Sequence, residues 1–352
     1  MKKLLNRIFI EGLSGMAYGL FATLIIGTII QQIGNLIGGD IGTLVYQFGK
    51  FAAAMTSAGI GVGVACRFKE SSLVVLSAAT AGMVGGFAEK ITGGTVFTEE
   101  GALLLSGPGE PLGAFLAAYI AIELSRLIAG KTKLDIILAP MLGIFGGSAV
   151  GILVGPPISR LMTRLGDMIN WGTEQQPFLM GIVVSVLMGM ILTLPISSAA
   201  LGVILNLSGL AAGAATIGCC CNMVGFAVAS FKENGVSGLI AQGIGTSMLQ
   251  VPNIMRHPLI WLPAILSSAI LGPIGTMVMK MTSNATGSGM GTAGFVGQIM
   301  TWQTMVPGED PMIVLAKIAV MHFLLPGILS LLIANGLRKL GWIRPGDMKL
   351  DM

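Results

Sequence analysis

Charged residues are scarce in this chain of 352 residues, since Asp, Glu, Lys and Arg together make up only 10% of it. An ordinary soluble domain carries about 25%. Hydrophobic residues reach 53%, and the mean hydropathy is +0.85, so the polar groups are too few to cover the surface of a water-soluble globule. The composition therefore indicates an integral membrane protein. It argues against nucleic-acid-binding, secreted and disordered scaffolding proteins.

Cysteine and histidine are also rare, with four and two residues respectively. Cys219, Cys220 and Cys221 are adjacent, which gives neither the ligand spacing of a metal site nor a disulfide framework. We interpret them as small apolar packing residues. The sequence contains no Walker, G-x-S-x-G or H-E-x-x-H motif, which argues against an ATP-driven pump and an intramembrane hydrolase. We expect neither a metal nor another cofactor.

Long intervals without charge mark the helices that we expect to cross the membrane, since one crossing needs about 20 apolar residues. Both chain ends are expected in the cytoplasm, because this orientation places nearly all Lys and Arg loops on that side. Two later segments, 236–251 and 282–305, are too short or too polar to span and are predicted to be re-entrant hairpins. The predicted spans are 9–34, 42–64, 72–88, 111–129, 136–154, 178–196, 197–215, 216–231, 259–279 and 312–335.

Residues 155–172 differ from the spans around them. Their apolar residues recur at helical spacing, whereas Arg160, Arg164 and Asp167 fall on other faces. This pattern predicts an amphipathic helix that lies in the membrane interface. We expect it to link two halves of a single membrane-embedded domain that extends over residues 1–352.

Polar side chains beside helix-breaking residues are the candidate substrate ligands. A charged side chain at membrane depth costs free energy, so its presence indicates a function. Glu110 lies in the sequence GPGEP, Gly107–Pro111, where glycine and proline prevent a regular helix and expose backbone groups around the carboxylate. This carboxylate is suited to accept hydrogen bonds from substrate hydroxyls or to pair with a cation. The alternative is that GPGEP is an exposed extracellular turn.

A second group of candidates accompanies the glycine-rich sequence AQGIGTSML. Gln242 lies within the predicted hairpin, and Asn253 and His257 lie between Pro252 and Pro258. Their amide and imidazole groups can hydrogen-bond a hydroxyl, and the histidine can also relay a proton. The alternative is a juxtamembrane turn that faces lipid headgroups.

Two further polar residues fall in apolar surroundings. Asn206, at a break within the predicted span 197–215, is a candidate for lining a cavity, whereas His322, in a strongly apolar stretch before Pro326, is interpreted as a buried structural histidine. Broken helices, glycine-rich hairpins and a few polar residues at membrane depth are typical of a transporter for a small polar molecule.

Three phrases between Gly218 and Gln298 carry a family resemblance: CCCNMVGFAVASFKENG, GLIAQGIGTSMLQVPNI and GTAGFVGQI. They resemble the phosphotransferase-system enzyme IIC family that includes the PfoR-like toxin regulators, and the likeness extends over essentially the whole chain. The resemblance implies an all-α membrane fold of the glucose-superfamily kind, with about ten spans, re-entrant hairpins and an amphipathic linker helix. It also implies a homodimer in the bacterial plasma membrane.

Sugar-transporting enzyme IIC proteins hold the sugar with a histidine and with the glutamate of a Gly-x-x-Glu-Pro phrase. GPGEP matches that phrase at Gly107, Glu110 and Pro111, although it comes early in this chain and late in most of those proteins. His257 is a weaker match, because the order of the motifs differs. The resemblance further implies a separate IIB protein, phosphorylated on cysteine and served by IIA, because we expect no IIA or IIB domain in this chain.

The leading hypothesis is a permease component that binds a sugar or polyol at the membrane midplane and translocates it for phosphorylation by a IIB partner. Such a component takes part in a phosphohistidine-sugar phosphotransferase reaction but is not catalytic alone, and this part of the hypothesis comes from the resemblance. One alternative is a membrane sensor that keeps the transporter fold but controls gene expression. Another is a transporter of some small solute without phosphate transfer.

Overall fold

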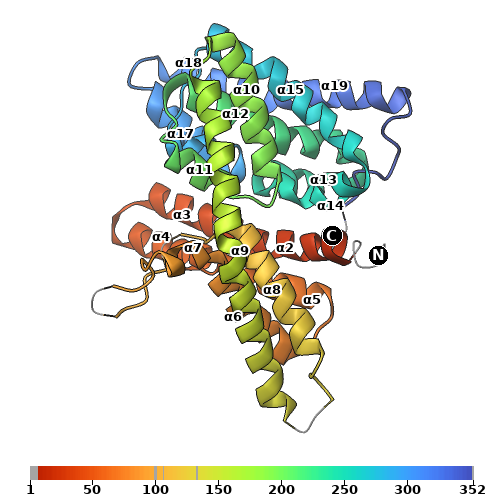
Figure 1. Ribbon diagram of the computed structural model, residues 1–352. Coiled ribbons are helices and arrows are strands. Elements are labelled where there is room, and N and C mark those ends of the chain that lie inside the picture. The colour runs from red at the N-terminus through yellow and green to blue at the C-terminus, as the bar shows by residue number, and fades with distance from the viewer. Residues whose placement is uncertain (1–6, 99–100, 106, 132–133, 351–352) are drawn as a thin grey trace. The chain divides into compact units, whose positions relative to one another are not determined.

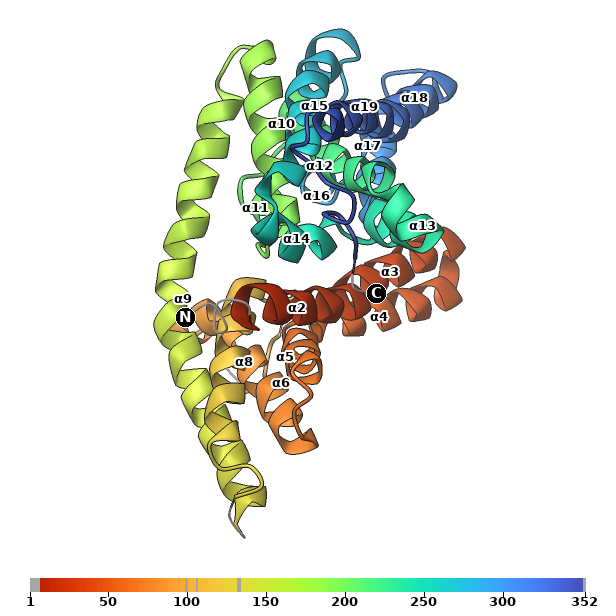
Figure 2. The same cartoon turned by 90° about the vertical axis from the view of Figure 1, so that its right-hand side faces the viewer.

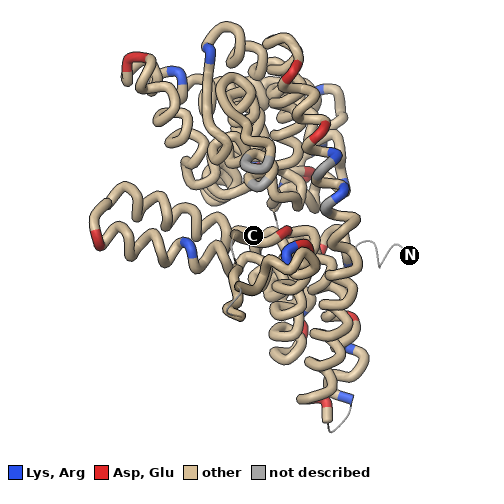
Figure 3. The backbone as a smooth tube through the Cα atoms, turned by 60° about the vertical axis from the view of Figure 1, so that its left-hand side comes forward, with Lys and Arg blue, Asp and Glu red and all other residues tan. Residues whose placement is uncertain are grey.

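The computed structural model describes residues 7–98, 101–105, 107–131 and 134–350, and its regular elements are helices (Figure 1). Within these residues the only β contacts are two isolated bridges, Phe97 with Leu103 and Gly209 with Ser283. The predicted all-α class is therefore confirmed. Lys, Arg, Asp and Glu are sparse along the helices and lie mostly near turns and helix ends (Figure 3).

The chain divides into two compact units, residues 1–163 and 164–352, which we describe separately. The boundary falls inside α9, Asp135–Thr173, a single helix of 39 residues. This helix contains both the predicted span 136–154 and the predicted linker 155–172. The linker is thus helical and continuous with the span before it, whereas its position in the membrane interface stays a prediction.

Unit 1 consists of helices up to the first part of α9. Its elements before α9 are η1 (Arg7–Gly12), α2 (Leu13–Leu20), η2 (Phe21–Ile25), α3 (Ile26–Ile37), α4 (Gly39–Ala54), α5 (Thr56–Arg67), α6 (Ser72–Gly86), α7 (Ala88–Thr92) and α8 (Pro111–Arg126). α3 packs against α4, α2 against α5, and α6 against α8 (Figure 2).

Glycine allows these helices to approach closely. A methyl group at Gly15 in α2 would lie 2.6 Å from the carbonyl oxygen of Gly63 in α5. On α9, glycines recur at every fourth residue from Gly143 to Gly155 and face neighbours within the same unit, since a methyl group at Gly151 would lie 2.8 Å from Cα of Gly85 in α6. Small residues at such contacts are a common device for packing helices in membranes.

Unit 2 is built around α12, whose apolar span is largely buried. α10, α15 and α19 pack against it (Figures 1 and 2). After α9 its elements are α10 (Pro177–Thr193), α11 (Ser198–Ile204), α12 (Gly209–Ala229), α13 (Phe231–Ile240), η3 (Ala241–Gly245), η4 (Ser247–Gln250), α14 (Val251–Arg256), η5 (Pro258–Trp261), α15 (Leu262–Pro273), η6 (Ile274–Val278), α16 (Ala285–Ser288), η7 (Ala293–Phe295), α17 (Val296–Met305), α18 (Pro311–Ile318), η8 (Ala319–Leu324) and α19 (Leu325–Lys339).

Among the described residues, five helical runs are long and apolar enough to cross a membrane, or six if the bent pair α4 and α5 is one span. The five runs are Arg7–Ile37, Asp135–Thr173, Gly209–Ala229, Pro258–Val278 and Pro311–Lys339. α6 and α10 are apolar but shorter, with 15 and 17 residues. The number is lower than the ten spans expected from hydropathy.

Two differences account for part of this gap. The predicted span 42–64 is bent by 54° between α4 and α5. The predicted spans 197–215 and 216–231 are instead the seven-residue α11 and the single long helix α12. Asn206 and Gly209 separate these two helices, because their φ angles of 47° and 57° lie in the left-handed region and cannot continue a right-handed helix.

Candidate functional site

Two irregular segments, residues 241–250 and 284–297, meet inside unit 2. Both consist of single helical turns rather than spans, and most of their residues are buried. Thr292 in the second segment donates a hydrogen bond from its hydroxyl to the carbonyl oxygen of Gly243 in the first. Gly291, with φ of 52°, lets this segment pack directly on α12, because a methyl group there would lie 2.7 Å from Cβ of Cys219.

The second segment turns into α17 through left-handed backbone. Gly294 and Phe295 have φ angles of 53° and 60°, a conformation that a bulky residue such as phenylalanine rarely adopts. Irregular backbone at membrane depth is tolerated where it is enclosed by protein or lines a cavity. The two segments therefore form a region of irregular backbone that is enclosed by protein.

Asn222 of α12 organises the polar side chains beside these segments. Its Oδ1 accepts hydrogen bonds from Nε1 of Trp261 at 2.8 Å and from Oγ1 of Thr193 at 3.1 Å. Its Nδ2 donates to the carbonyl oxygen of Gly218 at 3.1 Å. Thr193 in turn lies 2.8 Å from Oγ of Ser247 in η4. Both ends of the Asn222 amide are thus satisfied within the protein.

The predicted ligands Gln242 and Asn253 belong to one buried network. Gln250 donates from Nε2 to Oε1 of Gln242 at 2.8 Å, and Asn253 donates from Nδ2 to Oε1 of Gln250 at 2.9 Å. Gln242 also donates to Oγ of Ser230 at 2.9 Å. The structure therefore brings two of the predicted residues together, with Gln250 as the link that the sequence did not single out.

The chain's own C-terminal segment completes this network. Asn253 donates to the carbonyl oxygen of Lys349 at 2.8 Å, and Glu233 accepts from the backbone N–H of Met348 at 2.9 Å. The side chain of Met348 is fully buried. His257 is exposed, with Nε2 3.6 Å from Oδ1 of Asp347 in the same segment. The structure places Asn206 elsewhere in unit 2, in an exposed turn.

His322 is buried, as expected, but only one of its ring nitrogens has a partner. Nδ1 lies 3.1 Å from Nε2 of Gln298, whereas Nε2 has no hydrogen-bond partner. Gln298 is the last residue of the phrase GTAGFVGQ, which contributes to the family resemblance but predicted no role for this glutamine. The geometry therefore adds a polar pair that sequence reasoning missed.

Glu110 and Gly107 lie in unit 1, where GPGEP is anchored rather than free. Glu110 begins α8 and accepts a hydrogen bond at Oε1 from the N–H of Leu112 at 3.4 Å, while its own N–H donates to the carbonyl oxygen of Gly86 at 2.7 Å. Ser57 of α5 donates to the carbonyl oxygen of Pro108 at 2.8 Å. Gly107 has a φ of 83°, which the turn requires.

Burial dominates the electrostatics of Glu110. It raises the pKa of the carboxyl group from 4.5 to about 7, because the Leu112 N–H lowers that pKa by less than desolvation raises it. Near neutral pH the group therefore exchanges readily between an acid that donates a hydrogen bond and a carboxylate that only accepts.

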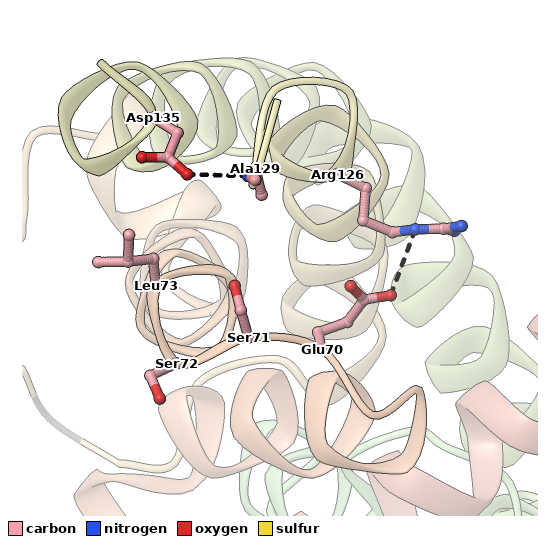
Figure 4. A pocket seen from close by; sticks show the side chains of 8 residues that line it. Glu70, Ser71, Ser72, Leu73, Arg126, Ala129 and Asp135 are labelled. Carbon is pink, nitrogen blue, oxygen red and sulfur yellow. Dashed lines mark hydrogen bonds and ion pairs between the residues drawn. The ribbon is translucent and has the colours of Figure 1, made fainter. Parts of the chain in front are cut away.

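A polar pocket of about 460 Å³ opens elsewhere in unit 1, between the start of α6 and the end of α8 (Figure 4). Glu70 lies 3.4 Å from Nε of Arg126 and 3.2 Å from Nη2 of Arg7. Asp135 accepts from the N–H of Gly130 at 2.8 Å. Glu70 and Arg126 pair with each other and the backbone holds Asp135, so we interpret these charged residues as structural. In the described part of the chain, no group of three His, Cys, Asp or Glu side chains could hold a metal ion.

Comparison with known proteins places this arrangement in a family. Curated proteins give no match to the chain. The family model for the phosphotransferase system, EIIC, matches residues 10–350, which include nearly all of both units. Because this match extends over nearly the whole chain, the protein belongs to the phosphotransferase-system EIIC family.

Proposed function

We propose that this protein is the membrane permease component of a sugar phosphotransferase system. It binds a neutral sugar or polyol within the membrane and moves it inward. A separate IIB protein, which receives its phosphate from IIA, then phosphorylates the sugar. Family membership supports the transport system, and the meeting of residues 241–250 with 284–297 is the observation that supports a substrate region in this chain.

These two segments support a binding site for a physical reason. Helical turns that stop within a membrane protein leave backbone N–H and C=O groups without intrahelical partners. Such groups are available to a polar ligand, and enclosing them in protein keeps them away from lipid. Transporter substrate sites are commonly built in this way, which is why the contact between Thr292 and Gly243 favours transport over a purely structural membrane domain.

The predicted ligands differ in whether their polar groups already have hydrogen-bond partners within the protein. Gln242 and Asn253 already hydrogen-bond within their network, and His257 lies near Asp347, so a substrate would have to replace partners there. Glu110 stays the preferred ligand from the sequence, because it is partly buried and its pKa lies near neutrality. Gly107 supports its turn, and Asn206 stays a candidate for lining a cavity.

The proposal includes a topology of about ten spans with both termini in the cytoplasm. In it the short helices α6 and α10 cross the membrane, and residues 236–251 and 282–305 are re-entrant. It also includes a homodimer in the bacterial plasma membrane. The glycines of α9 pack on α6 and α8 of their own chain, so the dimer would use another surface.

Membrane lipid is a further partner in the proposal. An apolar groove of about 520 Å³ lies between the last part of α9 and α10, and Met168, Trp171 and Val183 contribute to its lining. Its surface is suited to an acyl chain.

Two alternative functions predict different experimental outcomes. A PfoR-like regulator would lose control of gene expression on deletion while sugar uptake stays unchanged. An uncoupled transporter would accumulate its solute without phosphate. A permease coupled to IIB instead delivers sugar phosphate to the cytoplasm.

The proposal is tested by titrating the purified protein in detergent with sugars, polyols and sugar phosphates. The fluorescence of its four tryptophans reports binding. Glu110→Gln is compared with Glu174→Gln, a change at an exposed position in unit 2. Saturable binding of a neutral sugar supports the permease, and its loss in Glu110→Gln alone places Glu110 at the site. If a folded protein binds no sugar or polyol in the panel, the permease proposal is contradicted.

A further inference from the structure

We infer that Gln298, Thr301 and His322 form a buried site in unit 2 for one hydroxyl group of a neutral polyol. This inference rests on the proposed function, because it locates part of the binding site for that substrate. It assigns a role to the phrase GTAGFVGQ and to a histidine that the sequence alone suggested was structural.

The three side chains come from two elements and are almost entirely enclosed. Gln298 and Thr301 lie one turn apart on α17, and His322 lies on η8. Their exposed fractions are 8%, 0% and 0%. The amide Nε2 of Gln298 lies 3.1 Å from Nδ1 of His322 and 3.5 Å from Sγ of Cys220.

Each of the three side chains nevertheless keeps one buried polar atom that has no hydrogen-bond partner among the described residues. These atoms are Oε1 of Gln298, Oγ1 of Thr301 and Nε2 of His322. Buried polar groups in folded proteins nearly always have hydrogen-bond partners, and leaving them without one costs free energy. Gln298 contacts His322 and lies one helical turn from Thr301, so the free atoms of these neighbouring side chains indicate that a polar group outside the protein completes the site.

The chemistry of the free atoms selects a hydroxyl. Because the Gln298 amide N–H donates to Nδ1 of His322, the neutral ring carries its proton on Nε2, which is then a donor. Oε1 of Gln298 accepts, and the Thr301 hydroxyl can do either. A hydroxyl group donates once and accepts twice, so it matches all three. A phosphate, which mainly accepts, would face the lone pairs of Oε1.

The charge of the surroundings agrees with a neutral ligand. Gln298 and His322 hydrogen-bond to each other, and Gln298 also contacts Cys220, so these contacts involve no charged side chain. A sugar phosphate would therefore enter this region without a cation to balance it. Its exclusion suits a permease that binds the sugar before phosphorylation.

The backbone at the site is irregular on both sides. His322 lies on a π-helical stretch, and such stretches often occur at functional sites. α17 begins directly after the left-handed residue Phe295, in the segment whose Thr292 contacts Gly243. The site thus adjoins the substrate region in sequence and in structure. An ordered water would satisfy some of the free atoms in the empty protein, and the ligand hydroxyl would displace it.

Thr301→Val tests the site, with Thr304→Val as the matched control on the same helix. Thr304 donates its hydroxyl to the carbonyl oxygen of Met300 at 2.7 Å, so its hydroxyl is already used. In the tryptophan-fluorescence titration with neutral polyols, Thr301→Val is expected to weaken binding at least tenfold without lowering Tm. Thr304→Val is expected to bind like the wild type, and Thr301→Ser, which restores a hydroxyl, is expected to recover most of the affinity.

The outcomes separate this inference from the proposed function. If the wild type binds a polyol and Thr301→Val binds it equally well, this site is wrong and the permease proposal stands. If Thr301→Val loses binding and Tm together while Thr304→Val loses neither, the Thr301 hydroxyl is structural and the site is again wrong. If the folded wild type binds no polyol, the proposed function fails and this site fails with it.

Discussion

Gln250 donates a hydrogen bond of 2.9 Å from its buried side-chain amide to the backbone carbonyl oxygen of Met348, 98 residues further along the chain. The same amide group joins Gln242 and Asn253, both of which the sequence indicated as substrate ligands. The C-terminal segment is therefore part of the core of unit 2. Its backbone supplies the hydrogen-bond partners of buried side-chain amides.

Removal of residues 348–352 is expected to destabilise the protein. It would leave the Gln250 and Asn253 amides and the Glu233 carboxylate without their backbone partners. Each orphaned group costs about 1–3 kcal/mol, so the loss is expected to exceed about 3 kcal/mol. Thermal unfolding in detergent measures it. The control Lys349→Ala removes an exposed side chain and keeps the backbone carbonyl, so its Tm should match the wild type. Equal Tm values for the truncated and full chains would contradict this role.

Gly218 in α12 is expected to tolerate no side chain. A methyl group there would meet the backbone of Ser185 in α10, with 2.6 Å to its Cα, and backbone cannot move aside cheaply. Gly218→Ala is therefore expected to cost several kcal/mol, on the order of 2–4, like other overpacked core changes. Gly336→Ala in α19 is the control, since a methyl group there has open space around it and alanine favours a helix by about 1 kcal/mol. Thermal unfolding should rank Gly336→Ala at or above the wild type and Gly218→Ala well below.

Glu110 is expected to make stability depend on pH. Its pKa is about 7 in the folded protein and 4.5 in its ordinary state, so the folded state binds more protons between these values. Stability should therefore fall as pH rises from about 4.5 to about 7 and then level off. Comparing Tm at several pH values for the wild type and Glu110→Gln isolates this contribution. The decrease of Tm with pH should be smaller in the variant. An identical decrease in the two proteins would show that Glu110 is not the group responsible.

Glu70 is expected to matter more than Glu123 in the ion network of unit 1. Both carboxylates pair with Arg7 and Arg126, but Glu70 is 13% exposed, whereas Glu123 is 35% exposed. Water screens the more exposed carboxylate better, so Glu123→Gln should change stability by less than about 1 kcal/mol. Glu70→Gln should cost more, because the Glu70 carboxylate is more buried and its ion pairs are less screened by water. The reverse order in chemical denaturation would mean that the network is not organised around Glu70.

Hydropathy predicted the positions of most helices well. The predicted span 9–34 falls within the run Arg7–Ile37, and 312–335 falls within Pro311–Lys339, because long uncharged intervals leave few other structures for these residues. It did not predict the bend between α4 and α5. That bend lies at Met55, within a uniformly apolar interval, and it depends on packing against other helices, which hydropathy does not report.

The sequence predicted individual polar residues of the candidate site but not the contacts between them. The sequence marked Gln242 and Asn253 as polar residues near helix breaks, and the structure does join them. It gave no sign of Met348 as their partner, because a contact between segments nearly a hundred residues apart has no periodicity to reveal it. Likewise, the apolar stretch around His322 predicted burial correctly, but whether Nε2 has a partner depends on the three-dimensional position of Gln298.

Phosphate-coupled sugar transport is tested most directly in membrane vesicles. Right-side-out vesicles containing the protein are loaded with phosphoenolpyruvate and the soluble phosphotransferase proteins of the source bacterium. They are then given the radiolabelled sugar that binds most tightly in the fluorescence titration. We expect the label to accumulate inside as sugar phosphate, and only when both the protein and phosphoenolpyruvate are present. Accumulation of free sugar, or equal uptake by vesicles without the protein, would contradict the claim.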